Sequence, residues 1–338
     1  MENAVALKDA LGARFDRLKA GEDGWRELAD AGVLGLPFAE AHGGLGLAAR
    51  EGFAVLELLG ERAIALPYLE SVLLAGTLLD RAGGDHAASW LPRVAVGEAR
   101  LAFAWLDDAD PARAEREATG WRLGGGKLLV IGAAEADVLI LIAQSDEGRA
   151  AFLVPHDAVA MKAYPTIDGR RAADILLDHV SLPASARLAL TPNDIAQIFD
   201  VGAAAVAAEA AAIMARLVTD TRDYCRDREQ FGQKVSDFQV VQHRLVDMNI
   251  EARRAAAAAT LAVDALELAP GPRAKAVSAA KVAVADAARF VGQNAVQLHG
   301  GMGMTDALPI SALFKRLTVI ESEFGGRDEH LARYMALA

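Results

Sequence analysis

Cysteine is almost missing from this chain, which has Cys225 as the single example among 338 residues. One thiol cannot form an internal disulfide framework, and it cannot supply a cysteine-based zinc site. Basic residues are also few: 35 Lys and Arg stand against 46 Asp and Glu, a net charge of -11. This balance argues against a nucleic-acid-binding protein, whose affinity comes mainly from cations on phosphates. A local basic patch for a nucleotide-like ligand stays compatible with it.

Long apolar runs are missing as well, since none approaches the ~20 residues that a membrane-spanning helix needs. At the N-terminus, Leu7, Leu11 and Phe15 recur at helical spacing with charged residues between them. This pattern predicts an amphipathic helix and not a signal peptide. We therefore expect a cytoplasmic protein without a membrane span.

Three regions differ in residue pattern, and they predict three domains: 1–97 helical, 98–188 β, and 189–338 helical. Short β-type runs separated by glycine turns, without long helices between them, favour an antiparallel barrel or sandwich in the middle region. Thr191 followed by Pro192 is typical of a helix start, and four long helices are predicted after it, the last over 310–337. The predicted fold class is α+β, mainly helical, with a C-terminal four-helix bundle. The many alanines of the bundle indicate either close helix packing or helix propensity alone.

Two segments carry the functional signal, one with arginine and glycine and the other with a pair of glycines. The string Arg228-Glu229-Gln230-Phe231-Gly232 is followed by Phe238-Gln239, and Gln297-Leu298-His299-Gly300-Gly301 lies further on. A guanidinium group suits phosphate oxygens, and glycines let a backbone approach a ligand closely. With the loop that ends at Gly46, these segments resemble the acyl-CoA dehydrogenase family, and together they span most of the chain.

That resemblance implies a fold with an N-terminal helical domain, a central β domain and a C-terminal four-helix bundle. It also implies FAD as cofactor, an acyl-CoA substrate, and electron-transfer flavoprotein or a similar acceptor. The cofactor-binding residues that it predicts are Arg228, Phe231, Phe238, Gln239, Gln297, Leu298, His299, Gly300 and Gly301. In the family these segments serve the flavin of a neighbouring subunit, so a homo- or hetero-oligomer is expected.

The catalytic base is where the sequence departs from the family. Its reaction needs a carboxylate that removes the α-proton, at one of two positions that align here with Phe324 and Gly202. Neither residue can accept a proton. Asp200 is a weak candidate for a substitute, and Glu209, Glu321 and Glu323 are further ones, although a surface or ion-paired role is the simpler interpretation of each. The catalytic residue therefore stays unknown at this level.

The β region also departs, because the family's flavin-contacting strand and loop are replaced by the stretch from Ala102 to Pro111. Short chains with this Phe-Gly ending resemble a bacterial subgroup that forms mixed heterotetramers acting on steroid side-chain CoA thioesters. Two functions of different class follow. One is an FAD-dependent acyl-CoA dehydrogenase, an oxidoreductase of CH–CH bonds in lipid metabolism. The other is a non-catalytic subunit that completes a partner's FAD site. An acyl-CoA oxidase is a third option, and a metal site is not expected because no Glu-x-x-His pair occurs.

Overall fold

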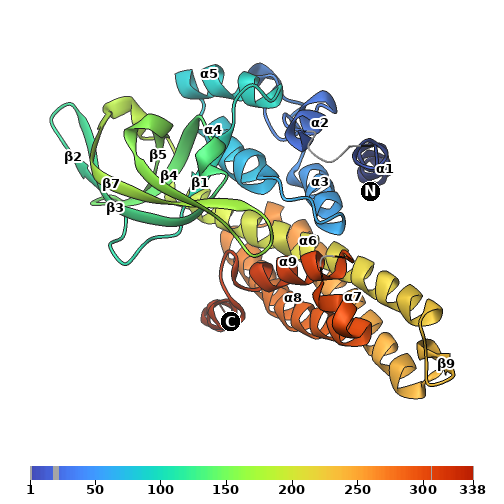
Figure 1. The fold of residues 1–338 in the computed structure, drawn as a ribbon. Coiled ribbons are helices and arrows are strands. Elements are labelled where there is room, and N and C mark those ends of the chain that lie inside the picture. Colours follow the sequence, from blue (N-terminus) through green and yellow to red (C-terminus); the bar gives the residue numbers. More distant parts are fainter. Residues whose placement is uncertain (1, 18–22, 306, 338) are drawn as a thin grey trace. The chain divides into compact units, whose positions relative to one another are not determined.

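The computed structural model describes residues 2–17, 23–305 and 307–337, and the chain folds into two compact units (Figure 1). The first unit comprises Met1–Val55 and Leu66–Phe199, and the second comprises Leu56–Ala65 and Asp200–Ala338. Helix α3 (Ala49–Glu61) and helix α6 (Pro192–Asp227) each begin in the first unit and end in the second.

The N-terminal part of the first unit is helical. Asp23 caps the helix that follows it, because its carboxylate accepts a hydrogen bond from the backbone N–H of Trp25 at 3.0 Å. Trp25 and Leu28 are buried on the inner face of that helix. The helices are α1 (Glu2–Phe15), α2 (Gly24–Asp30), α3 (Ala49–Glu61), the π-helix η2 (Leu69–Gly76), α4 (Thr77–Ala82) and α5 (Gly84–Ala95).

A seven-stranded sheet follows, in the order β1-β4-β2-β3-β7-β6 with β5 paired to β4. Its buried face is aliphatic and alanine-rich, with the rings of Trp121 and Phe152 in edge-to-face contact at 5.3 Å. Most neighbours are antiparallel, as predicted, but β4 pairs in parallel with β1 and β2. The strands are β1 (Leu101–Ala104), β2 (Arg113–Arg116), β3 (Gly120–Ile131), β4 (Val138–Ser145), β5 (Gly148–Pro155), β6 (Ala160–Pro165) and β7 (Arg171–Pro183).

Long helices form the second unit, and α7 runs alongside α8 over most of its length (Figure 1). Buried alanines at positions 252, 255, 259 and 262 line one face of α7, so small side chains serve helix packing here as well as helix propensity. The elements are α6 (Pro192–Asp227), the short strands β8 (Glu229–Gln230) and β9 (Gln233–Lys234), α7 (Gln239–Asp264), α8 (Pro270–His299), α9 (Ile310–Ser322) and α10 (Arg327–Ala336).

The expected last helix over 310–337 is two helices, because the chain turns sharply between them. Phe324 has φ 57° and Gly325 has φ 102°, which are left-handed values that no α-helix accommodates. Gly325 and Gly326 were the signal of this break, since glycine readily takes such a conformation.

One helix among the described residues, Pro192–Asp227, is long and apolar enough to cross a membrane. Of its apolar window, 83% is buried inside the protein, which fits the core helix of a globular fold.

Candidate functional site

The Arg228 segment forms a tight hairpin at the C-terminal end of α6. The backbone N–H of Arg228 still bonds to the carbonyl of Tyr224 at 2.9 Å, and its carbonyl accepts the N–H of Val235 at 2.8 Å. Phe231 and Gly232 form the two-residue loop between β8 and β9, both with positive φ, as a type I′ turn requires. The turn presents the Phe231 ring to solvent at 92% exposure, in edge-to-face contact with Phe238 at 6.2 Å.

The second predicted segment lies beside this hairpin. Tyr224 stacks on His299 with ring centroids 4.3 Å apart, and its hydroxyl donates to the His299 carbonyl at 3.4 Å. The His299 Nδ1 lies 2.8 Å from the Ala295 carbonyl, and burial lowers the pKa of this imidazole. Gly300 continues the chain with φ 60° and is exposed, as Gly301 is. Two segments about 70 positions apart therefore meet through Tyr224, which the sequence analysis did not single out.

The two positions predicted to lack the base are in contact with each other. A methyl group added at Gly202 would lie 2.8 Å from Cδ1 and Cε1 of Phe324, closer than real carbon atoms approach. The Phe324 ring is 7% exposed and fills the space above the glycine. Inside the second unit, the Phe324 ring therefore fills the space that a side chain at position 202 would need.

Hydrogen bonds from two side chains to backbone carbonyls hold the Phe324 turn in its strained conformation. The Lys281 ammonium donates to the carbonyls of Ile320 and Glu323, both at 2.8 Å, and His330 Nε2 lies 2.9 Å from the Phe324 carbonyl. Burial lowers the pKa of Lys281 to about 8 and also lowers the pKa of His330. A positive φ at a bulky residue persists only where such contacts over-determine it.

Substituting Gly202 by alanine therefore tests the packing directly. Alanine in an open helix stabilises by about 0.5–1 kcal/mol relative to glycine. Here the clash with the Phe324 ring should reverse the sign of this effect, so that Gly202→Ala lowers the free energy of unfolding by about 1–3 kcal/mol. We expect the loss to vanish in a Phe324→Ala background, measured as a double-mutant cycle by urea denaturation.

The matched control for this cycle is Gly271→Ala on α8, where an added methyl group would meet nothing within 4 Å. This variant should be neutral or slightly stabilising in both backgrounds. An equal loss from Gly202→Ala with and without the Phe324 ring would contradict the steric pairing.

Asp200, the predicted substitute for the base, is held between two arginines. Its Oδ2 accepts from Arg273 Nε at 2.8 Å, and its Oδ1 lies 2.7 Å from Arg333 Nη2. The residue is 1% exposed. Both carboxylate oxygens therefore face guanidinium groups, which is the arrangement of a structural ion pair.

The other three candidates are also ion-paired with arginines. Glu209 is buried and accepts two hydrogen bonds from Arg316, both at 2.6 Å, in a bidentate geometry. Glu323 pairs with the same guanidinium group at 2.9 Å, and Glu321 pairs with Arg289. Each of the four acidic residues considered as a base in the sequence analysis is therefore ion-paired with an arginine.

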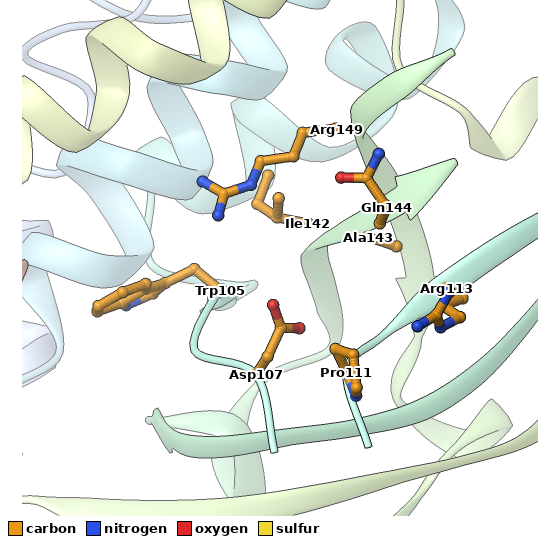
Figure 2. Close-up of a pocket in the computed structure, with 8 residues that line it drawn as sticks. All are labelled: Trp105, Asp107, Pro111, Arg113, Ile142, Ala143, Gln144 and Arg149. Atoms are coloured by element: carbon orange, nitrogen blue, oxygen red, sulfur yellow. The ribbon is translucent and has the colours of Figure 1, made fainter. Parts of the chain in front are cut away.

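A pocket of about 220 Å³ opens in the first unit where the loop after β1 meets β2, β4 and β5. Figure 2 shows the Arg149 side chain extending across it, with the Asp107 carboxylate and the Gln144 carboxamide turned toward the same space. Trp105 and Arg113 stand at opposite edges of this view. The sequence flagged this loop only as a departure from the family's flavin-contacting strand.

Comparison with known proteins decides the family. Residues 8–98 match the family model "Acyl-CoA dehydrogenase, N-terminal domain", and residues 193–337 match "Acyl-CoA dehydrogenase, C-terminal domain". The chain belongs to the acyl-CoA dehydrogenase family. The family also confirms the fold class predicted from the sequence, mainly helical with a central sheet.

Among the relatives of this acyl-CoA dehydrogenase-family chain, acyl-CoA dehydrogenase FadE27 of Mycobacterium tuberculosis is 31% identical, with 96% of this chain and 89% of that protein covered. A solved structure of the ChsE4–ChsE5 complex from Mycobacterium tuberculosis has a TM-score of 0.91 at 28% identity, covering 99% and 97% of the two chains. A variant of the Tcur3481–Tcur3483 steroid ACAD has a TM-score of 0.89 at 29% identity, with the same coverage.

FAD is the cofactor of this family, and the exposed residues at the end of α6 and α8 fit it chemically. Among the described residues no carboxylate pairs with Arg228, so its guanidinium group is available to an anion. An added side chain at Gly300 or Gly301 would meet nothing within 4 Å, which indicates open space beside exposed backbone. FAD carries a diphosphate and an aromatic ring system. The diphosphate suits the Arg228 guanidinium group, and the ring system suits the phenyl ring of Phe231, which is 92% exposed.

Proposed function

We propose that this chain is a subunit of a mixed acyl-CoA dehydrogenase, in which it completes a partner's FAD site and leaves α-proton abstraction to the partner. The observation that carries the proposal is the contact between Phe324 and Gly202. Neither position where the family keeps its base carries a carboxylate, and the phenyl ring leaves no room for a side chain at position 202. The paired states of Asp200 and Glu209 support the same conclusion.

The reaction of the complex is α,β-desaturation of an acyl-CoA thioester. When bound, FAD accepts the β-hydrogen as a hydride, while the partner's carboxylate takes the α-proton and the C=C bond forms. In this chain Arg228 would hold the diphosphate of FAD through charge-assisted hydrogen bonds. Phe231 and Phe238 would cover the cofactor, and the exposed amides of Gly300 and Gly301 would face it. Gln239 and the C-terminal residues Gln297–His299 of α8 complete the proposed site.

The comparisons support a mixed assembly and a bulky acyl group. One similar structure is a complex of two differently named chains, and another is described as a steroid enzyme. We therefore propose a hetero-oligomer that acts on steroid-type or other bulky acyl-CoA thioesters and passes electrons to an electron-transfer flavoprotein. The domain boundaries proposed with it are 97/98 and 188/189.

Replacing Arg228 by alanine tests the cofactor assignment in the co-expressed complex. A buried diphosphate would lose a charge-assisted partner worth about 1.5–3 kcal/mol, so FAD should dissociate roughly 10- to 100-fold more readily. Flavin per complex, measured by absorbance after dialysis, should fall. Arg222→Ala is the matched control, because Arg222 lies near the end of α6, six positions before Arg228, is exposed and pairs with Asp223. Equal flavin retention in both variants would remove Arg228 from the site.

A further inference from the structure

Tyr224 joins the end of α6 to the end of α8 through three of its groups. Its backbone carbonyl accepts the N–H of Arg228 at 2.9 Å, which fixes the first residue of the hairpin. Its ring stacks on His299 with centroids 4.3 Å apart and an angle of 27° between the planes. Its hydroxyl donates to the His299 carbonyl at 3.4 Å. One half-buried residue therefore contacts both segments that carry the family's cofactor motifs.

The His299 side of this contact is fixed by α8 itself. A carbonyl oxygen only accepts, so the His299 Nδ1–H donates to the Ala295 carbonyl at 2.8 Å. This hydrogen bond sets the tautomer and the orientation of an imidazole whose residue is 4% exposed. The His299 carbonyl lies at the C-terminal end of α8, where carbonyls lack a helical donor, and the Tyr224 hydroxyl supplies one.

The glycine turn after His299 packs back against the same helix end. Gly303 is buried, and a methyl group added there would lie 2.8 Å from the Val296 carbonyl oxygen and 3.1 Å from the His299 Cβ. Gly300 and Gly301 lie between these two anchors, and an added methyl group at either would meet nothing within 4 Å. The turn is therefore held at both ends and open in the middle.

We propose that Tyr224 is a positioning residue for FAD, which sets the Arg228 hairpin and the Gly300–Gly301 turn at the separation that one bound cofactor needs. The inference rests on the proposed function, since it concerns the FAD site that these segments would complete. Charge-assisted hydrogen bonds require a defined geometry, and groups that are ordered before binding lose less conformational entropy when the ligand arrives. The stacked ring supplies that order between two helix ends that are distant in the sequence.

The rate of FAD dissociation from the co-expressed complex, followed by the fluorescence of released flavin after dilution, tests this role. Tyr224→Leu removes the stack and should raise that rate about 2- to 10-fold, the effect of losing one aromatic pair. Tyr224→Phe keeps the stack and loses only a long hydrogen bond, so it should restore most of the retention. Tyr334→Leu on α10 is the matched control, because Tyr334 is also half-buried in the second unit and its ring lies 5.2 Å from Lys275 Nζ.

The Arg228→Ala background distinguishes positioning from a general loss of stability. If Tyr224 acts by placing the guanidinium group, Tyr224→Leu should raise FAD dissociation by a smaller factor in the Arg228→Ala complex than in the unmodified one. A merely structural role would give the same factor in both backgrounds. Gly303→Ala approaches the turn from its other anchor, and it should raise FAD dissociation with Tyr224 intact.

The two proposals fail in different ways. Flavin retention by Arg228→Ala would remove the proposed FAD site itself. Loss of flavin from Arg228→Ala, with unchanged retention in Tyr224→Leu, would overturn the positioning role alone. An equal loss from Tyr334→Leu, or the same Tyr224→Leu factor with and without the Arg228 guanidinium group, would also overturn it. Thermal melting verifies that each variant is folded, and if Tyr224→Leu is not, an unchanged rate in folded Gly303→Ala contradicts the proposal.

Discussion

Replacing Arg316 by methionine should lower the free energy of unfolding by about 3–5 kcal/mol. The expected loss is large because the variant leaves Glu209 buried at 3% exposure without the two hydrogen bonds that it accepts from this guanidinium group. Glu323 would lose its ion pair with Arg316 in the same step. Methionine keeps most of the side-chain volume, so the effect isolates the uncompensated charge from a cavity. Urea denaturation followed by circular dichroism measures it.

Arg289→Met is the matched control, since Arg289 pairs with Glu321 at the surface with its side chain 61% exposed. An exposed ion pair of this kind contributes only about 0–1 kcal/mol. The double variant Glu209→Leu with Arg316→Met should recover much of the loss, because an apolar pair of similar volume removes the buried charge altogether. A loss from Arg316→Met as small as that from Arg289→Met would show that the buried pair does not hold the bundle together.

Much of the fold could be predicted from local patterns. The succession of a helical, a β and a helical region follows from residue periodicity, which is a local property. The parallel pairing of β4 with β1 was not accessible in this way, because strands far apart in the chain pair by tertiary contact. Gly325 and Gly326 indicated a break in the last helix near Phe324, but the apolar periodicity on both sides favoured one continuous helix.

The candidate site was predictable as a set of segments but not as a set of contacts. Arg228 and the Gly300 turn could be named from their motifs, whereas their meeting through Tyr224 and His299 depends on how α6 lies beside α8. The same holds for Asp200, because its two arginine partners lie more than 70 positions away in the sequence. Composition and motif cannot show that an acid is already ion-paired.

The proposed lack of a base in this chain has a kinetic consequence. This chain alone, reconstituted with FAD, should be reduced by an acyl-CoA ~10²–10⁴-fold more slowly than the mixed complex, the usual effect of removing a general base. The Phe324 ring and Gly202 cannot accept the α-proton, and Asp200 is held in ion pairs with Arg273 and Arg333. The Asp200→Asn variant of this chain should therefore leave the rate of the mixed complex unchanged, provided that the variant remains folded.

Anaerobic flavin bleaching by a bulky acyl-CoA, followed by stopped-flow absorbance, is the most direct measurement of this claim. It compares this chain alone, the mixed complex, and a complex whose partner carries glutamine in place of its catalytic carboxylate. The account predicts rapid bleaching only in the intact complex, and loss of that bleaching when the partner's carboxylate is removed. Rapid bleaching by this chain alone would contradict it, and abolition of that reaction by Asp200→Asn would identify Asp200 as the base.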